Sequence, residues 1–314
     1  MEGEHTALVF PGQGSQKVGM GRELAAAFPV ARAAFVLADE ILGFNLTQLA
    51  WEGPEAELND TLNTQPCLLT HSMAALQVFE QYFPDFRPAF AAGHSMGELT
   101  ALVASRALLY RDGLILARKR GECMKVAGEI NPGGMAAILG LDIPLLDRIC
   151  TEASRKGEIV QVANDNCPGQ VVISGASPAL DRALTAAQQA GARRAVRLAV
   201  SIAAHSPLME NAQASFSQAV DASHLKRPAI PVIGNVNASP LTNEDQACED
   251  LKAQLTHRVR WTESIQYMLS KGVTTFIELG NGTVLAGLIK RIDKQATVIS
   301  LGTAADFEKL ASGG

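Results

Sequence analysis

The sequence predicts an α/β fold with a parallel sheet as its core and a small ferredoxin-like α+β subdomain inserted into it. Near both ends of the chain, short apolar segments alternate with helical ones, as in parallel sheets covered by helices. From the Pro-Gly-Gly run at 132–134 to residue 198, the order strand-helix-strand-strand-helix-strand indicates a split β-α-β unit. The length of 314 residues suffices for a large domain with a smaller insert.

We therefore assign residues 1–129 and 199–314 to the α/β core and residues 130–198 to the ferredoxin-like subdomain. In the core we expect strands at 7–10, 90–92, 231–235, 274–279 and 298–300, and helices at 19–28, 64–83, 114–126, 207–220, 251–255, 262–270 and 284–292, with one more from Glu98. In the subdomain we expect strands at 135–139, 159–163, 171–174 and 195–198, and helices at 143–154 and 178–190. The helix at 64–83 should open near Gln65-Pro66, because proline is tolerated in a first turn.

The composition excludes several classes of protein. A net charge of -5 argues against nucleic-acid binding, which needs a dominant basic surface. No apolar run reaches the roughly 18 residues of a membrane span. The polar segment 1–6 lacks the basic and apolar regions of a secretory signal, so we expect a cytoplasmic protein. The five cysteines are scattered without a C-x-x-C motif, which predicts free thiols and neither a metal nor a cofactor.

The strongest local signal is Gly-His-Ser-Met-Gly at 93–97, which lies between a predicted strand and a predicted helix. A G-x-S-x-G motif in this context is typical of a nucleophile elbow, where a tight turn exposes the serine hydroxyl. The N-terminus of the following helix offers free N–H groups to a developing oxyanion. We therefore interpret Ser95 as a nucleophile, although so short a pattern also occurs by chance.

A serine nucleophile needs a base to accept its proton. His205 follows the strand-like segment 200–204 and precedes Ser206-Pro207 and a helix, a junction from which it can point into a cleft. From position alone it can equally be a structural histidine. The other histidines are His5, His71, His94, His224 and His257. No acidic residue between Ser95 and His205 has the setting of a third triad member, and a backbone carbonyl can orient a histidine as well.

Two further features have both a structural and a functional interpretation. The loop Gly-Gln-Gly-Ser-Gln at 12–16 follows the first strand and is neither a P-loop nor a dinucleotide fingerprint. It is either a plain turn or a place where the Gln13 N–H faces a reacting carbonyl. In the helix at 114–126, Arg118 and Lys119 fit a solvated face. Arg120 precedes Gly121, where the helix can pack closely against another element.

Taken together, the motifs resemble the malonyl-CoA:acyl carrier protein transacylases of fatty-acid synthesis, from about residue 6 to residue 302. The motifs are GQGSQ at 12–16, TQP at 64–66, GHSMGE at 93–98, RGxxM at 120–124, NDNCPGQVVISG at 164–175, VSxxxHSPLM at 200–209, QLxxxVRW at 254–261 and ELGNGTVLAGLIKRI at 278–292. The resemblance implies a hydrolase-like α/β core with a ferredoxin-like insert. It also implies that Ser95 is acylated, that His205 is its general base, and that Gln254 helps to orient the histidine.

The resemblance implies further roles in binding the substrate. The backbone N–H groups of Gln13 and Met96 would form the oxyanion hole. Arg120 would bind the malonyl carboxylate, because a planar guanidinium matches a planar anion. Many malonyl-selective relatives carry phenylalanine where this chain has Ala204, so we expect a wider pocket near the α-carbon and weaker exclusion of methylmalonyl groups.

The implied reaction is ping-pong transfer from malonyl-CoA to the phosphopantetheine thiol of holo acyl carrier protein, without cofactor or metal, by a monomer. The alternatives are a stand-alone polyketide synthase acyltransferase, an acyl-thioester hydrolase and a non-catalytic carrier-binding module. Acyl carrier proteins of this pathway are generally acidic, so docking on this acidic chain requires a local basic patch. We expect it at Arg193, Arg194 and Arg197 rather than at Lys290 and Arg291.

Overall fold

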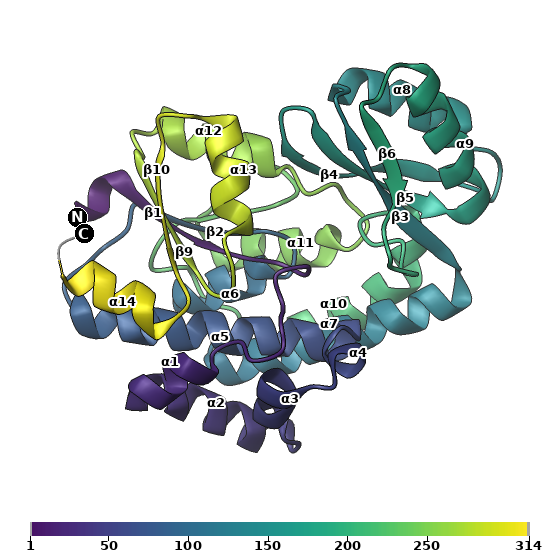
Figure 1. The fold of residues 1–314 in the computed structure, drawn as a ribbon. Coiled ribbons are helices and arrows are strands. Elements are labelled where there is room, and N and C mark those ends of the chain that lie inside the picture. Colours follow the sequence, from purple (N-terminus) through teal and green to yellow (C-terminus); the bar gives the residue numbers. More distant parts are fainter. Residues whose placement is uncertain (1, 313–314) are drawn as a thin grey trace.

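The structure of this protein is a computed structural model, which describes residues 2–312. Two sheets organise the chain (Figure 1). The larger sheet has six strands in the order β10-β9-β1-β2-β7-β8. The smaller sheet has four strands in the order β4-β5-β3-β6 and lies to one side of the larger sheet (Figure 1). The predicted fold class, an α/β protein with a mostly parallel core sheet, is confirmed.

The six-stranded sheet is parallel except at one edge. Its strands are β1 (Thr6–Phe10), β2 (Phe90–Gly93), β7 (Val232–Ile233), β8 (Pro240–Leu241), β9 (Thr275–Leu279) and β10 (Thr297–Leu301). All neighbouring pairs are parallel apart from β7 and β8, which form a short antiparallel pair. Because β1 lies in the interior of the sheet, every one of its residues is buried, and side chains alternate between two helical layers.

Helices cover both faces of this sheet. Leu8 and Phe10 join the larger apolar cluster with residues of α5 and α7, whereas Ala7 and Val9 pack with residues of α12 and α13 on the opposite face (Figure 1). The helices of the core are α1 (Arg22–Ala27), α2 (Pro29–Leu42), α3 (Leu46–Glu52), α4 (Glu55–Leu58), α5 (Thr61–Tyr82), α6 (Gly97–Ala104), α7 (Tyr110–Ile130), α10 (Glu210–Ala222), α11 (Glu244–Gln254), α12 (Trp261–Ser270), α13 (Val284–Ile292) and α14 (Ala304–Ala311). Two short 3₁₀ turns are η1 (Gly3–His5) and η2 (Pro207–Met209).

The four-stranded sheet is antiparallel throughout. It contains β3 (Gly133–Leu139), β4 (Val160–Cys167), β5 (Gln170–Ala176) and β6 (Arg194–Arg197), with the helices α8 (Ile143–Ala153) and α9 (Ser177–Gln189). The first and third of these strands are central and the fourth is an edge, which is the order of a ferredoxin-like unit. A third apolar cluster fills the space between this sheet and its two helices. That residues 130–198 form a separate unit stays a prediction.

The sequence analysis missed several elements and misplaced others. Residues 29–58 form α2, α3 and α4, for which no helix was predicted, although α2 buries Ala31, Ala34, Phe35 and Ala38 at helical spacing. The helix α14 was also missed, and α11 begins well before the predicted position 251. The strands β4 and β5 extend toward each other through the segment expected as a loop, which leaves only a tight turn at 168–169.

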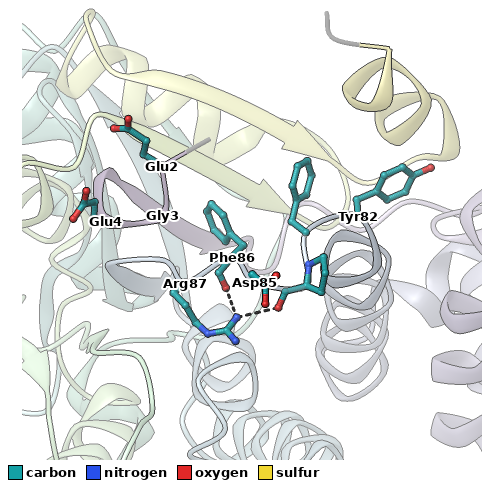
Figure 2. A pocket seen from close by; sticks show the side chains of 9 residues that line it. Glu2, Gly3, Glu4, Tyr82, Asp85, Phe86 and Arg87 are labelled. Carbon is teal, nitrogen blue, oxygen red and sulfur yellow. Dashed lines mark hydrogen bonds between the residues drawn. The ribbon is translucent and has the colours of Figure 1, made fainter.

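A cavity of about 650 Å³ lies at the C-terminal end of α5. It is lined by Glu2, Gly3, Glu4 and the residues 82–87, which Figure 2 shows around the turn after α5. The guanidinium of Arg87 donates hydrogen bonds to the carbonyl groups of Pro84 and Phe86, at 3.0 and 2.9 Å. The cavity contains neither Ser95 nor any histidine, so its size alone does not make it the active site.

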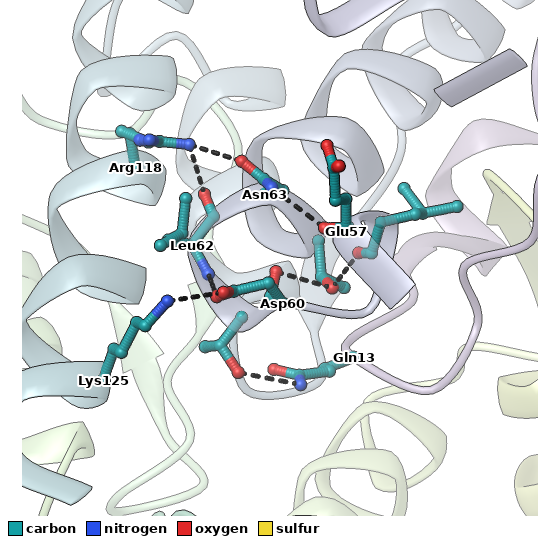
Figure 3. Close-up of polar contacts among 10 residues, drawn as sticks. Gln13, Glu57, Asp60, Leu62, Asn63, Arg118 and Lys125 are labelled. Atoms are coloured by element: carbon teal, nitrogen blue, oxygen red, sulfur yellow. Dashed lines mark hydrogen bonds and ion pairs between the residues drawn. The ribbon is translucent and has the colours of Figure 1, made fainter. Parts of the chain in front are cut away.

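The helix α5 begins at Thr61, with Asp60 as its N-cap, and therefore contains Pro66 in its interior. Proline has no N–H, so the Leu62 carbonyl loses its partner within the helix. Arg118 of α7 donates to that carbonyl at 3.3 Å and to Asn63 Oδ1 at 2.5 Å (Figure 3). The interpretation of Arg118 as part of a solvated face was wrong, because this side chain bridges two helices.

None of the helices within residues 2–312 combines the length and the apolar character that crossing a membrane requires.

Candidate active site

Ser95 lies on the turn between β2 and α6, as the nucleophile-elbow motif predicts. Its backbone has φ +53°, in the left-handed region that non-glycine residues seldom adopt. The turn packs against β1 so tightly that a Cβ on Gly97 would lie 2.3 Å from the Phe10 carbonyl oxygen. The small flanking residue is therefore required for the close approach that exposes the serine at the carboxyl edge of the sheet.

His205 is the histidine that meets the serine. Its Nε2 lies 2.8 Å from Ser95 Oγ, and its Nδ1 lies 2.8 Å from the Gln254 carbonyl oxygen. A carbonyl can only accept, so Nδ1 carries the proton and the Nε2 lone pair faces the serine hydroxyl. The backbone carbonyl thus takes the place of a triad carboxylate, one of the two arrangements that the sequence left open.

The environment of His205 keeps its ring neutral. The side chain is buried, and burial lowers its pKa to about 3, with the nearby Arg120 cation acting in the same direction. The hydrogen bond to the Gln254 carbonyl opposes this shift by stabilising the N–H. A neutral imidazole beside the serine hydroxyl is the protonation state that a general base needs.

Arg120 brings a buried cation to the same place. Its Nη1 donates to Gln65 Oε1 at 3.0 Å, and its Nη2 donates to Gln254 Oε1 at 2.7 Å and to Ser95 Oγ at 3.3 Å. Within residues 2–312 its guanidinium forms no salt bridge. Gly121 next to it allows α7 to touch α5, since a Cβ there would lie 2.5 Å from Leu62 Cα. A buried cation whose hydrogen-bond partners are all neutral favours an anionic ligand beside the serine.

The loop after β1 packs directly on the elbow. A Cβ on Gly12 would lie 2.4 Å from the His94 carbonyl oxygen, which brings the next residue, Gln13, close to Ser95. Within residues 2–312 the backbone N–H groups of Gln13 and Met96 form no hydrogen bond with another group of the chain. Two free N–H donors near the serine can receive a negative oxygen.

Comparison with known proteins decides the family. Residues 7–306 match the acyl transferase domain family. The chain belongs to that family. It is 43% identical over 302 residues to a malonyl-CoA:acyl carrier protein transacylase of Bacillus subtilis, covering 96% of this chain and 95% of the relative. It is 42% identical over 295 residues to the transacylase of the same name from Escherichia coli K12, covering 94% and 95%.

Solved structures agree with this assignment. A malonyl-CoA:acyl carrier protein transacylase from Xanthomonas oryzae superposes on this acyl transferase with a TM-score of 0.95 at 41% identity, covering 100% of this chain and 99% of the other. A malonyl-transacylase solved in complex with a type II polyketide synthase carrier protein has a TM-score of 0.94 at 38% identity, covering 98% and 99%.

The sequence analysis of this acyl transferase overlooked two side-chain amides that contact Ser95 and His205. Asn235 accepts a hydrogen bond from the Ser95 N–H at 2.8 Å, and Gln161 donates to the His205 carbonyl oxygen at 2.8 Å. Asn235 ends a predicted strand at the same sheet edge as the elbow, which is the signal that could have found it. Gln161 comes from β4 of the smaller sheet, and nothing in the sequence links it to the histidine.

Ala204 and Gln13 are the other residues that the sequence predicts for this site. Ala204 is buried beside His205 and belongs to the larger apolar cluster of the acyl transferase. A cavity of about 380 Å³ adjoins the loop after β1 and is lined by Gln13, Thr61, Lys125 and residues 199–202, among others. In Figure 3 Gln13 donates to Thr61 at 3.2 Å while Lys125 reaches Asp60 at 2.6 Å. The lining of this cavity includes Gln13 but neither Ser95 nor His205.

Proposed function

We propose that this acyl transferase moves the malonyl group from malonyl-CoA to the phosphopantetheine thiol of holo acyl carrier protein. The observation that carries the proposal is the buried, unpaired guanidinium of Arg120, 3.3 Å from the nucleophilic Ser95 Oγ. An acyl group that ends in a carboxylate supplies the missing negative charge. The full-length relatives that bear the transacylase name support the same substrate.

The first half-reaction forms the malonyl ester on Ser95. The hydroxyl proton passes to His205 Nε2 as Ser95 Oγ attacks the thioester carbonyl, and the N–H groups of Gln13 and Met96 stabilise the resulting oxyanion. Collapse of the tetrahedral intermediate breaks the C–S bond. The departing CoA sulfur then takes the proton from His205, which restores the neutral imidazole.

The second half-reaction runs through the same groups in the opposite sense. His205 accepts the proton of the carrier thiol, and the sulfur attacks the malonyl ester on Ser95. The intermediate collapses with loss of Ser95 Oγ, which recovers its proton from His205. Since a thioester is exchanged for a thioester, the overall transfer is reversible.

In this scheme Arg120 selects the acyl group, and Gln254 orients both Arg120 and His205. The Gln254 carbonyl fixes the tautomer of His205, while its side chain orients Arg120. A guanidinium held by neutral amides leaves donors free for the malonyl carboxylate. Ala204, next to the histidine, sets the room near the α-carbon of the acyl group.

Two alternative functions use the same scaffold. A polyketide synthase acyltransferase performs the same chemistry with another carrier, and one structural relative was solved with such a carrier. A thioester hydrolase would transfer the acyl group to water, but a buried arginine is of no use for hydrolysing neutral acyl groups. A non-catalytic carrier-binding module has no need of Ser95 and His205 in contact. We favour a monomeric cytoplasmic enzyme of fatty-acid synthesis.

Intact-protein mass spectrometry tests the proposal. The enzyme is mixed with malonyl-, methylmalonyl- or acetyl-CoA, and the mass of the protein reports the ester. We expect stoichiometric malonylation, weaker methylmalonylation and little acetylation. Adding holo acyl carrier protein should discharge the ester onto the carrier. Rapid release of free malonate instead would assign the chain to the hydrolases, and discharge to polyketide carriers only would assign it to that pathway.

A further inference from the structure

Asn235 joins the two sides of the nucleophile elbow. Its Oδ1 accepts from the Ser95 N–H at 2.8 Å, and its Nδ2 donates to the Gly93 carbonyl oxygen at 2.8 Å. The side chain is buried, and within residues 2–312 no other side chain forms a hydrogen bond with both of these backbone groups. Because Ser95 holds a left-handed conformation, its N–H needs a fixed partner if the turn is to keep this shape.

Two buried carboxyl groups hold Asn235 in turn. The Asn235 backbone N–H lies 3.0 Å from Glu98 Oε2 and 3.1 Å from Asp250 Oδ2. Glu98 comes from α6, directly after the elbow, and Asp250 comes from α11. Both side chains are buried, and their carboxyl groups are neighbours because they accept from the same N–H. Two buried carboxyl groups this close repel each other when both are ionised, which favours a proton on one of them at neutral pH.

The hydrogen-bond pattern indicates which group holds the proton. Asp250 also accepts from the Val236 N–H, so it behaves as an acceptor only. Glu98 Oε1 is buried and has no donor, whereas its Oε2 accepts from Asn235 and from Gln254 Nε2 at 3.0 Å. A proton on Glu98 would give this carboxyl group an O–H donor and remove the repulsion between two buried negative charges. Burial raises the pKa of both carboxyl groups, with that of Glu98 well above its ordinary value.

We propose that Asn235 is a positioning residue for the Ser95 nucleophile, and that a protonated Glu98 bonded to an ionised Asp250 fixes Asn235 and Gln254 in place. Glu98 accepts hydrogen bonds from the two residues that support Ser95 and His205. Through Asn235 it fixes the Ser95 N–H, and through Gln254 Nε2, which also donates to the Ser95 carbonyl oxygen at 3.0 Å, it orients the residue that supports His205 and Arg120. Neither Asn235 nor Glu98 contacts the acyl group in this scheme.

The first test replaces Asn235 by alanine, with Asn237→Ala as the matched control, because Asn237 is exposed on the same loop. We expect the maximal rate of Ser95 malonylation to fall about 10²-fold in Asn235→Ala, as small misplacements of reacting groups do. The KM for malonyl-CoA should stay within about threefold, since Arg120 is untouched. A purely structural role would lower thermal stability without this split between rate and KM, so a folded Asn235→Ala with near-normal acylation overturns the proposal.

The isosteric Asn235→Asp decides the matter if the alanine variant does not fold. It keeps an acceptor for the Ser95 N–H but turns an oxygen toward the Gly93 carbonyl, so its acylation should also be slow at an unchanged KM. Acylation by Asn235→Asp at the wild-type rate contradicts the positioning role.

The second test concerns the proton. Glutamine copies a protonated glutamate, because its carbonyl can accept from Asn235 and Gln254 while its amide donates to Asp250. Glu98→Gln should therefore keep acylation within about threefold of wild type, whereas Glu98→Leu should slow it at least tenfold. If Glu98→Gln is as slow as Glu98→Leu, a negative charge on Glu98 is required and the assignment of the proton is wrong.

Discussion

Ser95 and His205 both hold the left-handed backbone conformation, with φ of +53° and +59°, and their side chains meet at 2.8 Å. Strained residues persist only where the surroundings over-determine them. Here the Ser95 N–H is fixed by Asn235 and the His205 carbonyl by Gln161. The contact between the two side chains is thus supported by the amide of Asn235, in the turn after β7, and by the amide of Gln161, in β4 of the smaller sheet.

We predict that Ser95→Ala abolishes acyl-enzyme formation and that His205→Ala slows it by about 10²–10⁴-fold, the usual effect of losing a general base. His224→Ala is the matched control, because His224 is exposed yet has a similarly left-handed backbone. Intact-protein mass spectrometry with malonyl-CoA measures all three variants. Stoichiometric malonylation of Ser95→Ala would show that the nucleophile lies elsewhere.

Replacement of Arg120 should impair malonyl transfer more than acetyl transfer. In Arg120→Ala the malonyl carboxylate enters a buried site without its partner, which costs about 2–5 kcal/mol in kcat/KM. Acetyl transfer should fall much less or rise, because an acetyl group carries no charge. Arg111→Ala, on the exposed face of the same helix, is the control. Equal losses for malonyl- and acetyl-CoA would identify Arg120 as a structural residue only.

The pH dependence follows from the buried histidines. Burial lowers the pKa of His205 to about 3, so the neutral base persists far below pH 6.5. The rate of Ser95 acylation should therefore stay flat from pH 8 to about pH 5, in a stopped-flow or quenched assay. An acid limb centred near pH 6.5 would contradict this environment for the histidine.

Stability should change with pH even where the rate does not. His205 and His71 have pKa values lowered to about 3 and about 4 in the folded chain, whereas an unfolded histidine titrates near 6.5. The unfolded state therefore binds more protons below pH 6.5, and the free energy of unfolding falls as the pH drops toward 4. Urea titrations at several pH values test this, and His71→Gln should reduce the slope.

The sequence predicted best what is local. The elbow at Ser95 could be predicted because its strand, turn and helix lie within about fifteen residues, and the order of six elements predicted the ferredoxin-like sheet. The general base could not be chosen from position, since His205 lies 110 residues away and meets Ser95 only through the fold. Its orienting group is a backbone carbonyl, which no residue type can signal.

Arg118 and Arg120 illustrate the limit of pattern analysis. They lie two residues apart on one helix, and the sequence alone does not distinguish their surroundings. Arg118 donates to the carbonyl group of α5 that Pro66 leaves without a helical partner, whereas Arg120 points toward Ser95. The difference depends on where α5 crosses α7, a tertiary fact that the sequence of either helix does not contain.

A larger side chain at position 204 should sharpen the choice of acyl group. Ala204→Phe removes space beside His205, so it should improve the preference for malonyl- over methylmalonyl-CoA by about 1–3 kcal/mol, the usual worth of a methyl group in a pocket. Ala204 is already buried, so Ala204→Val is a gentler variant that should shift the ratio in the same direction. Unchanged ratios of kcat/KM in both variants would place this residue away from the α-carbon.

The last prediction concerns the docking of the carrier. Arg197 forms a salt bridge with Asp181 and donates to the Ser177 carbonyl oxygen. Of the three arginines in this cluster, Arg193 and Arg194 are therefore the ones whose charge can attract an acidic carrier. Arg194 begins the edge strand β6. From there the chain leads through residues 199–202, which line the cavity beside Gln13, to His205. An acidic carrier bound there could deliver its phosphopantetheine arm to the cavity beside Gln13.

Reversing Arg193 and Arg194 to glutamate should therefore raise the KM for holo acyl carrier protein and flatten its dependence on salt, because complementary charge steers association. Self-acylation from malonyl-CoA should be unaffected, since the carrier takes no part in that half-reaction. The matched control reverses Lys290 and Arg291, the basic pair in the last turn of α13. If the control raises the carrier KM at low ionic strength and Arg193→Glu with Arg194→Glu does not, the carrier docks against α13 instead of β6.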